Sequence, residues 1–258
     1  MKIGFSTGSI ALDDVQHGLD VATHSRTSAV ELSALREDEL DPLLQSLDRL
    51  RSQLESFEYV SFHAPSKREH MSEVEFVGKL QQVADRGWAI IVHPDVIEDF
   101  SLWRRLGKAV CIENMDKRKR IGRTAAQLQE IFAQLPEATF CFDIGHARQV
   151  DPTMQEAESF LRNFHDRLRQ VHMSYVNSQS RHERLNFESI RAFQRVSHWF
   201  DDAIPIILET PVQRGEVEEE IAAADQVLTF ASRGLHGHAI FGERPPVRSD
   251  CAEAVSGE

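Results

Sequence analysis

The chain has 258 residues, of which 41% are hydrophobic, and it carries a formal charge of −12. Enough apolar side chains are present to build a globular core, which excludes a disordered or fibrous protein. The negative charge provides no overall attraction to nucleic acid or to an anionic membrane. Its three cysteines show no paired spacing, so we expect a reducing compartment rather than a disulfide framework.

The N-terminal segment MKIGFSTGSI lacks the long apolar run and the cleavage site of a signal peptide. No stretch of the sequence reaches the roughly 18 apolar residues that a membrane-spanning helix needs. We therefore expect a cytoplasmic protein that does not enter a membrane.

Short apolar runs alternate along the chain with longer segments in which hydrophobic residues recur at helical spacing. The runs expected to form buried strands are Lys2–Ser6, Ala29–Leu32, Tyr59–His63, Ala89–His93, Ala109–Glu113, Thr139–Asp143, Gln170–Ser174 and Pro205–Glu209. Between them, leucines at helical spacing predict one helix over Asp41–Phe57. This alternation indicates parallel strands joined by crossover helices. A count of eight strands favours a closed (β/α)₈ TIM barrel over an open doubly wound sheet, and no glycine-rich nucleotide loop supports the latter.

Residues typical of helix ends, and a change in composition, indicate the later helices and the end of the domain. The pair Asp151–Pro152 predicts a helix with proline at its first position. The last helix is expected over Val217–Ala231. After Gly234 the composition turns to Gly, Pro, Arg and Ser. We therefore predict a single barrel domain over residues 1–233 and a flexible or extended C-terminal tail over residues 234–258.

Metal-ligating side chains fall at or near the C-terminal ends of the last six predicted strands. They are His63, His93, Glu113, Asp143, His172 and Glu209. Two further histidines, His146 and His182, follow the sixth and seventh strands. In a barrel these strand ends meet at one mouth, where catalytic groups gather. Each residue alone has an ordinary structural explanation, but so many ionisable groups in one ring would be costly to bury without a partner. A divalent metal removes that cost, so the pattern predicts a metal centre.

The motifs around these residues resemble those of the xylose isomerase-like TIM-barrel superfamily, over about residues 1–212. The matching segments are VSFHAP, IIVHPD, CIENMD, CFDIGHAR, VHMSYV and IILETP. The superfamily includes endonuclease IV, which is the family 2 AP endonuclease, and the sugar-phosphate isomerases and epimerases. The resemblance implies the barrel fold and one of two plans for the metal ligands.

The smaller plan, that of the isomerases and epimerases, holds one divalent metal. The residues that match it are Glu113, Asp143, His172 and Glu209. In that plan His146 would contact the substrate. The larger plan, that of endonuclease IV, adds histidines to these four residues to build a three-zinc cluster. Its first metal would be held by His63, His93 and Glu113, which bridges to the second metal, while His146 and His182 would belong to the third.

The sequence departs from the larger plan at Ser180, which stands where the endonuclease pattern has an aspartate ligand of the third metal. A serine hydroxyl is a poor zinc ligand, which puts the third metal in doubt. The resemblance therefore implies two or three divalent metals per chain, with Zn²⁺ expected before Mn²⁺ or Fe.

The number of metals decides the expected chemistry. Metals about 3.5–4 Å apart activate water and clamp the oxygens of a phosphoester, so the leading hypothesis is hydrolysis of a phosphoester in a small anionic sugar-containing substrate. Glu113, Glu209 and His146 would be its catalytic residues. The alternative is a one-metal sugar or sugar-phosphate isomerase or epimerase, in which Glu113 and Glu209 transfer the proton. A second alternative is a barrel that binds metal without catalysis.

Basic residues follow several of the predicted strands and favour an anionic substrate. The candidate substrate-binding residues are Arg36, Lys67, Lys117 and Arg181. Lys117 opens a run of four basic residues, 117–120, for which a phosphate clamp and a solvated surface run are equally good explanations. The net charge and the lack of apolar wedge loops count against duplex DNA as the substrate. The sequence carries no indication of the oligomeric state.

Overall fold

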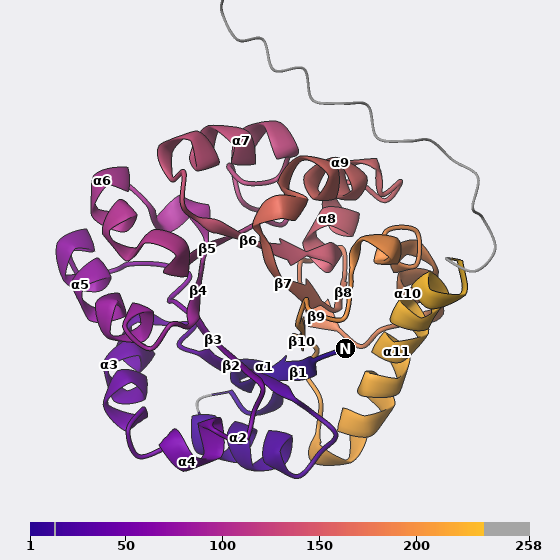
Figure 1. Ribbon diagram of the computed structural model, residues 1–258, viewed down its shortest axis with the longest axis horizontal. Helices are drawn as coiled ribbons and strands as arrows, with labels where there is room; N and C mark the ends of the chain where they lie inside the picture. The colour runs from indigo at the N-terminus through magenta and orange to yellow at the C-terminus, as the bar shows by residue number, and fades with distance from the viewer. Residues whose placement is uncertain (13, 235–258) are drawn as a thin grey trace, which may run out of the picture.

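The computed structural model describes residues 1–12 and 14–234. Within them the chain forms a closed barrel of parallel strands with helices around it (Figure 1). The barrel strands are β1 (Ile3–Ser6), β2 (Ala29–Ser33), β3 (Tyr59–His63), β4 (Ala89–Val92), β5 (Val110–Glu113), β6 (Thr139–Asp143), β7 (Leu168–Met173) and β10 (Ile206–Leu208). Consecutive barrel strands pair in parallel, and β1 closes the ring against β10. The predicted single (β/α)₈ TIM barrel is confirmed.

Helices fill the crossovers between these strands and cover the outside of the barrel. They are α1 (Thr7–Ile10), α2 (Val15–Thr23), α3 (Glu37–Ser46), α4 (Arg51–Leu54), α5 (Glu73–Ala84), α6 (Phe100–Trp103), α7 (Ala125–Gln134), α8 (Ile144–Val150), α9 (Gln155–Phe164), α10 (Phe187–Phe193) and α11 (Val217–Gly234). None of the helices in residues 1–12 and 14–234 is long and apolar enough to cross a membrane. Gly234 ends α11 rather than opening the tail, and residues 235–258 lie outside the described part of the chain.

Side chains of the barrel strands alternate between the helix layer and the barrel interior, because a strand repeats every two residues. On β3 and β6 the outward side chains of Phe62 and Phe142 join the main core beneath the helices. The inward side chains form a small separate cluster, which consists of Ala89, Ile91, Cys111 and Cys141. Two residues further along β5 and β6, the inward positions at the barrel mouth are Glu113 and Asp143. The strand period therefore stacks the candidate site directly on this inner layer.

The helix predicted over Asp41–Phe57 is interrupted in the structure, where it divides into α3 and α4. Leu47 and Leu50, between the two helices, keep right-handed helical backbone angles and remain buried. The leucine spacing therefore continues from α3 into α4, although the regular helical hydrogen bonds are interrupted between them. This is why spacing alone predicted one helix.

The predicted start of α9, the second helix after β6, is also wrong by three residues, since α9 begins at Gln155 and not at Pro152. The carboxylate of Asp151 accepts hydrogen bonds from the backbone N–H groups of Thr153 and Glu156. Met154, with a φ of 64°, turns the chain into the helix. Asp151 thus closes the turn ahead of α9 with one oxygen and, with the other, caps a backbone N–H in its first turn.

Candidate metal centre

The predicted ligands converge at the C-terminal mouth of the barrel. Their ligand atoms form two groups, each with all atoms within 4.8 Å of one another. The first ligand group consists of His63, His93 and Glu113. The second ligand group consists of Glu113, Asp143, His172 and Glu209. The two groups draw on the ends of six barrel strands and share the Glu113 carboxylate.

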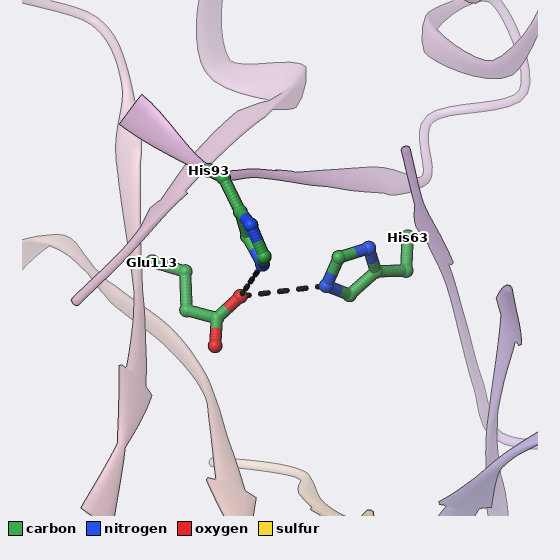
Figure 2. A group of neighbouring side chains, drawn as sticks. All are labelled: His63, His93 and Glu113. Carbon is green, nitrogen blue, oxygen red and sulfur yellow. Dashed lines mark ion pairs between the residues drawn. The ribbon is translucent and has the colours of Figure 1, made fainter. Parts of the chain in front are cut away.

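The two oxygens of Glu113 face different neighbours. Oε2 lies 3.4 Å from Nε2 of His63 and 3.2 Å from Nε2 of His93, so both imidazoles point at one oxygen (Figure 2). Oε1 lies 3.2 Å from Nδ1 of His146 and 3.7 Å from Nδ1 of His172. The two oxygens of Glu113 therefore face in different directions, one toward the imidazoles of the first ligand group and one toward His172 of the second.

Several buried carboxylate and imidazole atoms of the two ligand groups lack a hydrogen-bond partner among the described residues. They include Glu113 Oε2, Asp143 Oδ2, His172 Nδ1 and Glu209 Oε2. In the first group, Nδ1 of His63 lies 2.8 Å from the carbonyl oxygen of Ala64, so it carries the proton and leaves the Nε2 lone pair free in the neutral ring. These buried atoms face imidazole nitrogens or carboxylate oxygens at 3.1–3.7 Å, and such a set of carboxylates and imidazoles suits a divalent metal. The residues therefore fit the metal centre that the sequence predicts.

Local hydrogen bonds fix the positions of Glu113 and Asp143. Asn114, directly after Glu113, donates from Nδ2 to the carbonyl of Asp143 at 2.8 Å and accepts at Oδ1 from the N–H of Asp143 at 2.8 Å. This pair of bonds ties the end of β5 to the end of β6. Asp143 also caps α8, because its Oδ1 accepts from the N–H of His146 at 2.6 Å. Its other oxygen, Oδ2, is left for the second ligand group.

The close packing of α8 against the strand ends requires a glycine at position 145. A Cβ there would lie 2.5 Å from the carbonyl oxygen of Ser174 and 2.8 Å from Cγ2 of Val176. We expect Gly145→Ala to cost about 1–3 kcal/mol of unfolding free energy and to shift His146. Chemical denaturation measures the first effect, and chelator competition measures the accompanying loss of metal affinity. Gly78→Ala, where a Cβ meets nothing within 4 Å, is the matched control.

His182 is placed by a hairpin where the sequence predicted a loop. The short strands β8 (Tyr175–Val176) and β9 (His182–Glu183) pair antiparallel, and the turn is closed by Asn177, whose Oδ1 accepts from the N–H of Arg181 at 3.0 Å. The ring of His182 lies 2.7 Å from the Ser174 hydroxyl and 3.7 Å from a carboxylate oxygen of Glu209. The hairpin thus carries His182 over the mouth of the barrel.

The predicted third metal position has a different environment from the other two. The ring centroids of His146 and His182 lie 5.4 Å apart, yet neither residue belongs to the two ligand groups found in the described part of the chain. Ser180, with a φ of 58°, lies in the hairpin turn, where its hydroxyl donates to Oε1 of Gln149 at 3.0 Å. The amide of Gln149 donates back to the same hydroxyl at 2.7 Å. Ser180 therefore has a structural partner in place of a metal.

Burial and neighbouring charges shift the ionisation of the ligands strongly. Burial raises the pKa of Asp143 to about 8. Burial opposes the charge on Glu113, but the surrounding imidazoles, His93 first, hold its pKa well below the usual range. Burial likewise opposes the charge on His172, but Cys141 and Glu209 raise its pKa well above the usual value. Burial also opposes the charge on His146, but Asp143, Glu113 and Glu209 together raise its pKa to about 10.

Metal binding near neutral pH is expected to release protons. At pH 7 the metal-free site holds protons on Asp143, whose pKa is about 8, and on His172, whose pKa is raised. Both groups must lose them to bind a cation. The apparent enthalpy of Zn²⁺ binding, measured by calorimetry, should therefore vary with the ionisation enthalpy of the buffer. The variation should be smaller at pH 9, above the Asp143 pKa, and identical enthalpies in all buffers at pH 7 would contradict the expected release.

A cavity of about 490 Å³ opens above the ligand groups and shows which basic residues reach the site. Arg181, on the hairpin, lines it. From the basic run 117–120, Arg118 and Lys119 line the cavity, and Lys117 is exposed outside the lining. Both lining side chains form ion pairs with acidic neighbours: Arg118 pairs with Asp116 at 2.5 Å, and Lys119 pairs with Asp95 at 2.7 Å.

The other two candidate substrate-binding residues lie elsewhere. Arg36 caps α3, pairs with Glu39 at 2.6 Å and lines a separate cavity beside α2. Lys67 is exposed and is not part of the lining above the ligands. Of the four predicted substrate contacts, the structure thus brings Arg181 to the site.

Two residues of the site escaped the sequence analysis. Asn114 follows a predicted ligand directly, but nothing in one sequence shows that its side chain joins two strands. Glu31 lies in the middle of β2, where its side chain is fully buried and contacts His172. The signal for Glu31 was available, since it is the one charged residue in the apolar run 29–32 and alternates with two core side chains.

Structures of known proteins resemble this chain over most of its length. A xylose isomerase domain protein from Alicyclobacillus acidocaldarius subsp. acidocaldarius superposes with a TM-score of 0.61 at 14% identity, covering 90% of this chain and 99% of its own. Endonuclease IV from Thermus thermophilus superposes with a TM-score of 0.56 at 17% identity, covering 90% and 100%. This chain has the TIM-barrel fold of these proteins. The IolI protein, solved with a bound zinc atom, adds a TM-score of 0.59 at 15% identity, covering 90% and 99%.

Sequence comparison adds nothing to this structural likeness. No protein-family model matches the chain, and no curated protein matches it. At identities of 14–17% the similar structures establish the fold alone.

Proposed function

We propose that this protein is a metal-dependent hydrolase that cleaves a phosphoester in a small anionic sugar-containing substrate. The bridging orientation of Glu113 carries the proposal. Its two carboxylate oxygens face separate ligand groups, and His63 and His93, which complete the first group, would have no metal-binding role in a one-metal enzyme. Two adjacent cations are the arrangement that suits phosphoester cleavage.

The two cations are proposed to be zinc, because imidazole and carboxylate ligands in these sets suit Zn²⁺. The IolI protein, which has this fold, was solved with a zinc atom. Two metals are proposed rather than three, since Ser180 cannot replace the aspartate of the third position and its hydroxyl is engaged by Gln149. When bound, the metals supply Lewis acidity to the phosphoester oxygens and activate a water.

The protein's own residues bind and orient the substrate in this proposal. Arg118, Lys119 and Arg181 place positive charge on the lining of the cavity, where an anionic phosphoester would lie. His146 and His182 line the same cavity and can donate hydrogen bonds to the oxygens of the phosphoester. The volume of about 490 Å³ suits a small sugar phosphate. Duplex DNA is not favoured, given the net charge of −12.

The second ligand group favours one competing function. Glu113, Asp143, His172 and Glu209 form a complete four-residue set even without the first group. With a single metal, Glu113 and Glu209 could transfer a proton at the carbon beside a sugar carbonyl. A xylose isomerase domain protein shares this fold. The competing function is therefore a sugar or sugar-phosphate isomerase or epimerase.

A substrate screen with zinc-loaded protein tests the proposal. The panel should contain sugar phosphomonoesters, phosphodiesters, oligonucleotides with an abasic site, and ketoses with their phosphates. We expect phosphate release or diester cleavage with a small phosphorylated sugar. Epimerisation or isomerisation of a ketose without phosphoester cleavage would overturn the proposal in favour of the one-metal enzyme. Cleavage confined to abasic DNA would retain hydrolysis but contradict the small substrate.

A further inference from the structure

Glu31 is a carboxylate enclosed inside the barrel, one layer below the metal-binding mouth. Its side chain has no exposed surface, and its neighbours on β2, Val30 and Leu32, face the main core on the other side of the sheet. Inside residues 1–12 and 14–234 it forms no ion pair with a lysine or arginine, and its ion-pair partner is His172. An ionised carboxylate at such depth is costly unless its neighbours are arranged to stabilise it.

The surroundings of Glu31 supply hydrogen bonds to a single oxygen. Oε2 accepts from the hydroxyl of Ser61 at 3.0 Å and from Nε2 of Gln170 at 2.8 Å, and it lies 3.1 Å from Nε2 of His172. Gln170 is itself oriented by Tyr59, whose hydroxyl donates to its Oε1 at 2.7 Å. The carboxylate is therefore held in one orientation by side chains from β3 and β7.

The ring of His172 lies between Glu31 and the second ligand group, with one nitrogen facing each. Nε2 faces down to Glu31, while Nδ1 faces up to the second ligand group, 3.3 Å from Oε1 of Glu209 and 3.7 Å from Oε1 of Glu113. Nδ1 is buried and has no hydrogen-bond partner among the described residues. Nε2 of His172 also lies 2.8 Å from the amide nitrogen of Gln170, which can donate but not accept, so Glu31 is the neighbour that can accept a proton from Nε2. A metal ligated by Nδ1 requires that Nε2 carry the ring proton, and the carboxylate acceptor favours that tautomer.

We propose that Glu31 is a positioning residue of the metal centre, which fixes the ring of His172 with Nδ1 toward the metal and increases its affinity as a ligand. Glu31 does not touch the metal or the substrate and acts through His172. The inference rests on the metal centre of the proposed function, but not on the choice between hydrolysis and isomerisation. It makes the metal of the second ligand group depend on Glu31 and leaves the metal of the first group independent of it.

The test compares the zinc affinities of wild-type protein and Glu31→Gln by competition with a chromogenic chelator. Glutamine retains the size of the side chain and removes its charge. We expect one of two zinc ions to bind about 10–100-fold more weakly, while the other retains its affinity. Ser61→Ala is the matched control, because it removes a hydrogen bond to the same oxygen without touching His172, and we expect a smaller change.

A spectroscopic readout separates positioning from a general loss of packing. Cobalt substituted into the protein should show visible absorption bands that shift in Glu31→Gln and remain in Ser61→Ala. Equal zinc affinities and identical cobalt spectra in wild type and Glu31→Gln would overturn the inference. Failure of the wild-type protein to bind metal would instead overturn the proposed function, so the two failures are distinct.

A second variant guards against misfolding of the first. If thermal unfolding shows that Glu31→Gln is not folded, Glu31→Asp retains the charge and withdraws the carboxylate from His172 by one methylene. The same selective weakening of one zinc ion is expected there. Wild-type affinities for both ions in Glu31→Asp would overturn the inference.

Discussion

Replacement of Glu113 by glutamine is expected to weaken the binding of both metals and to lower catalytic activity by about 10²–10⁴-fold. The reason is geometric, since the two oxygens of this one side chain serve both ligand groups. The amide keeps the shape of the carboxylate but removes the charge that attracts two cations. Metal content by plasma mass spectrometry and turnover of the best substrate measure the two effects.

Glu188→Gln is the matched control for Glu113→Gln. Glu188 lies on α10 with 82% of its side chain exposed, so the same chemical change there should leave metal content and activity unaltered. Retention of both metals in Glu113→Gln would contradict the bridging role. Loss of a single metal would show that Glu113 belongs to one group and does not join the two.

Replacement of His63 by alanine is expected to remove the metal of the first ligand group and leave that of the second. His63 contacts Oε2 of Glu113 and is not a member of the second group, which therefore keeps its complete ligand set. Under the two-metal mechanism we expect hydrolysis to fall by about 10²-fold or more, because one of the two cations that stabilise the phosphoester oxygens is lost. The test measures metal content and kcat/KM together.

His17→Ala provides the control for His63→Ala, since His17 is exposed on α2 and lies outside both ligand groups. Full activity in His63→Ala, with one metal still bound, would contradict the two-metal hydrolase. That result would instead support the one-metal isomerase or epimerase, in which His63 has no metal to bind.

The barrel and the ligand ring were predictable because both depend on local pattern. Apolar runs separated by helical segments predict the strands, and parallel pairing then brings every strand end to one mouth. His63, Glu113 and Asp143 end their strands as predicted, while His93 and Glu209 lie one residue beyond β4 and β10. The fold places all of them together without any further information.

The contacts that orient the ring were not predictable from spacing. Asn114 and Glu31 act through hydrogen bonds to other strands, and their partners become neighbours only when the barrel closes. The loop conformations were not predictable either. The hairpin that carries His182 and the turn at Ser180 depend on side-chain hydrogen bonds of Asn177 and Gln149. The positions of Lys67 and Lys117 likewise follow from loop geometry rather than from their place after a strand.

A two-metal centre bridged by Glu113 is tested most directly by the metal content per chain. Protein purified without chelators or a metal-affinity tag would be analysed by plasma mass spectrometry, alongside variants at His63 and His93. We expect two equivalents of zinc, falling to one when either histidine is replaced. A single equivalent that does not respond to these histidines would contradict the two-metal centre, as would a chain that binds no divalent metal.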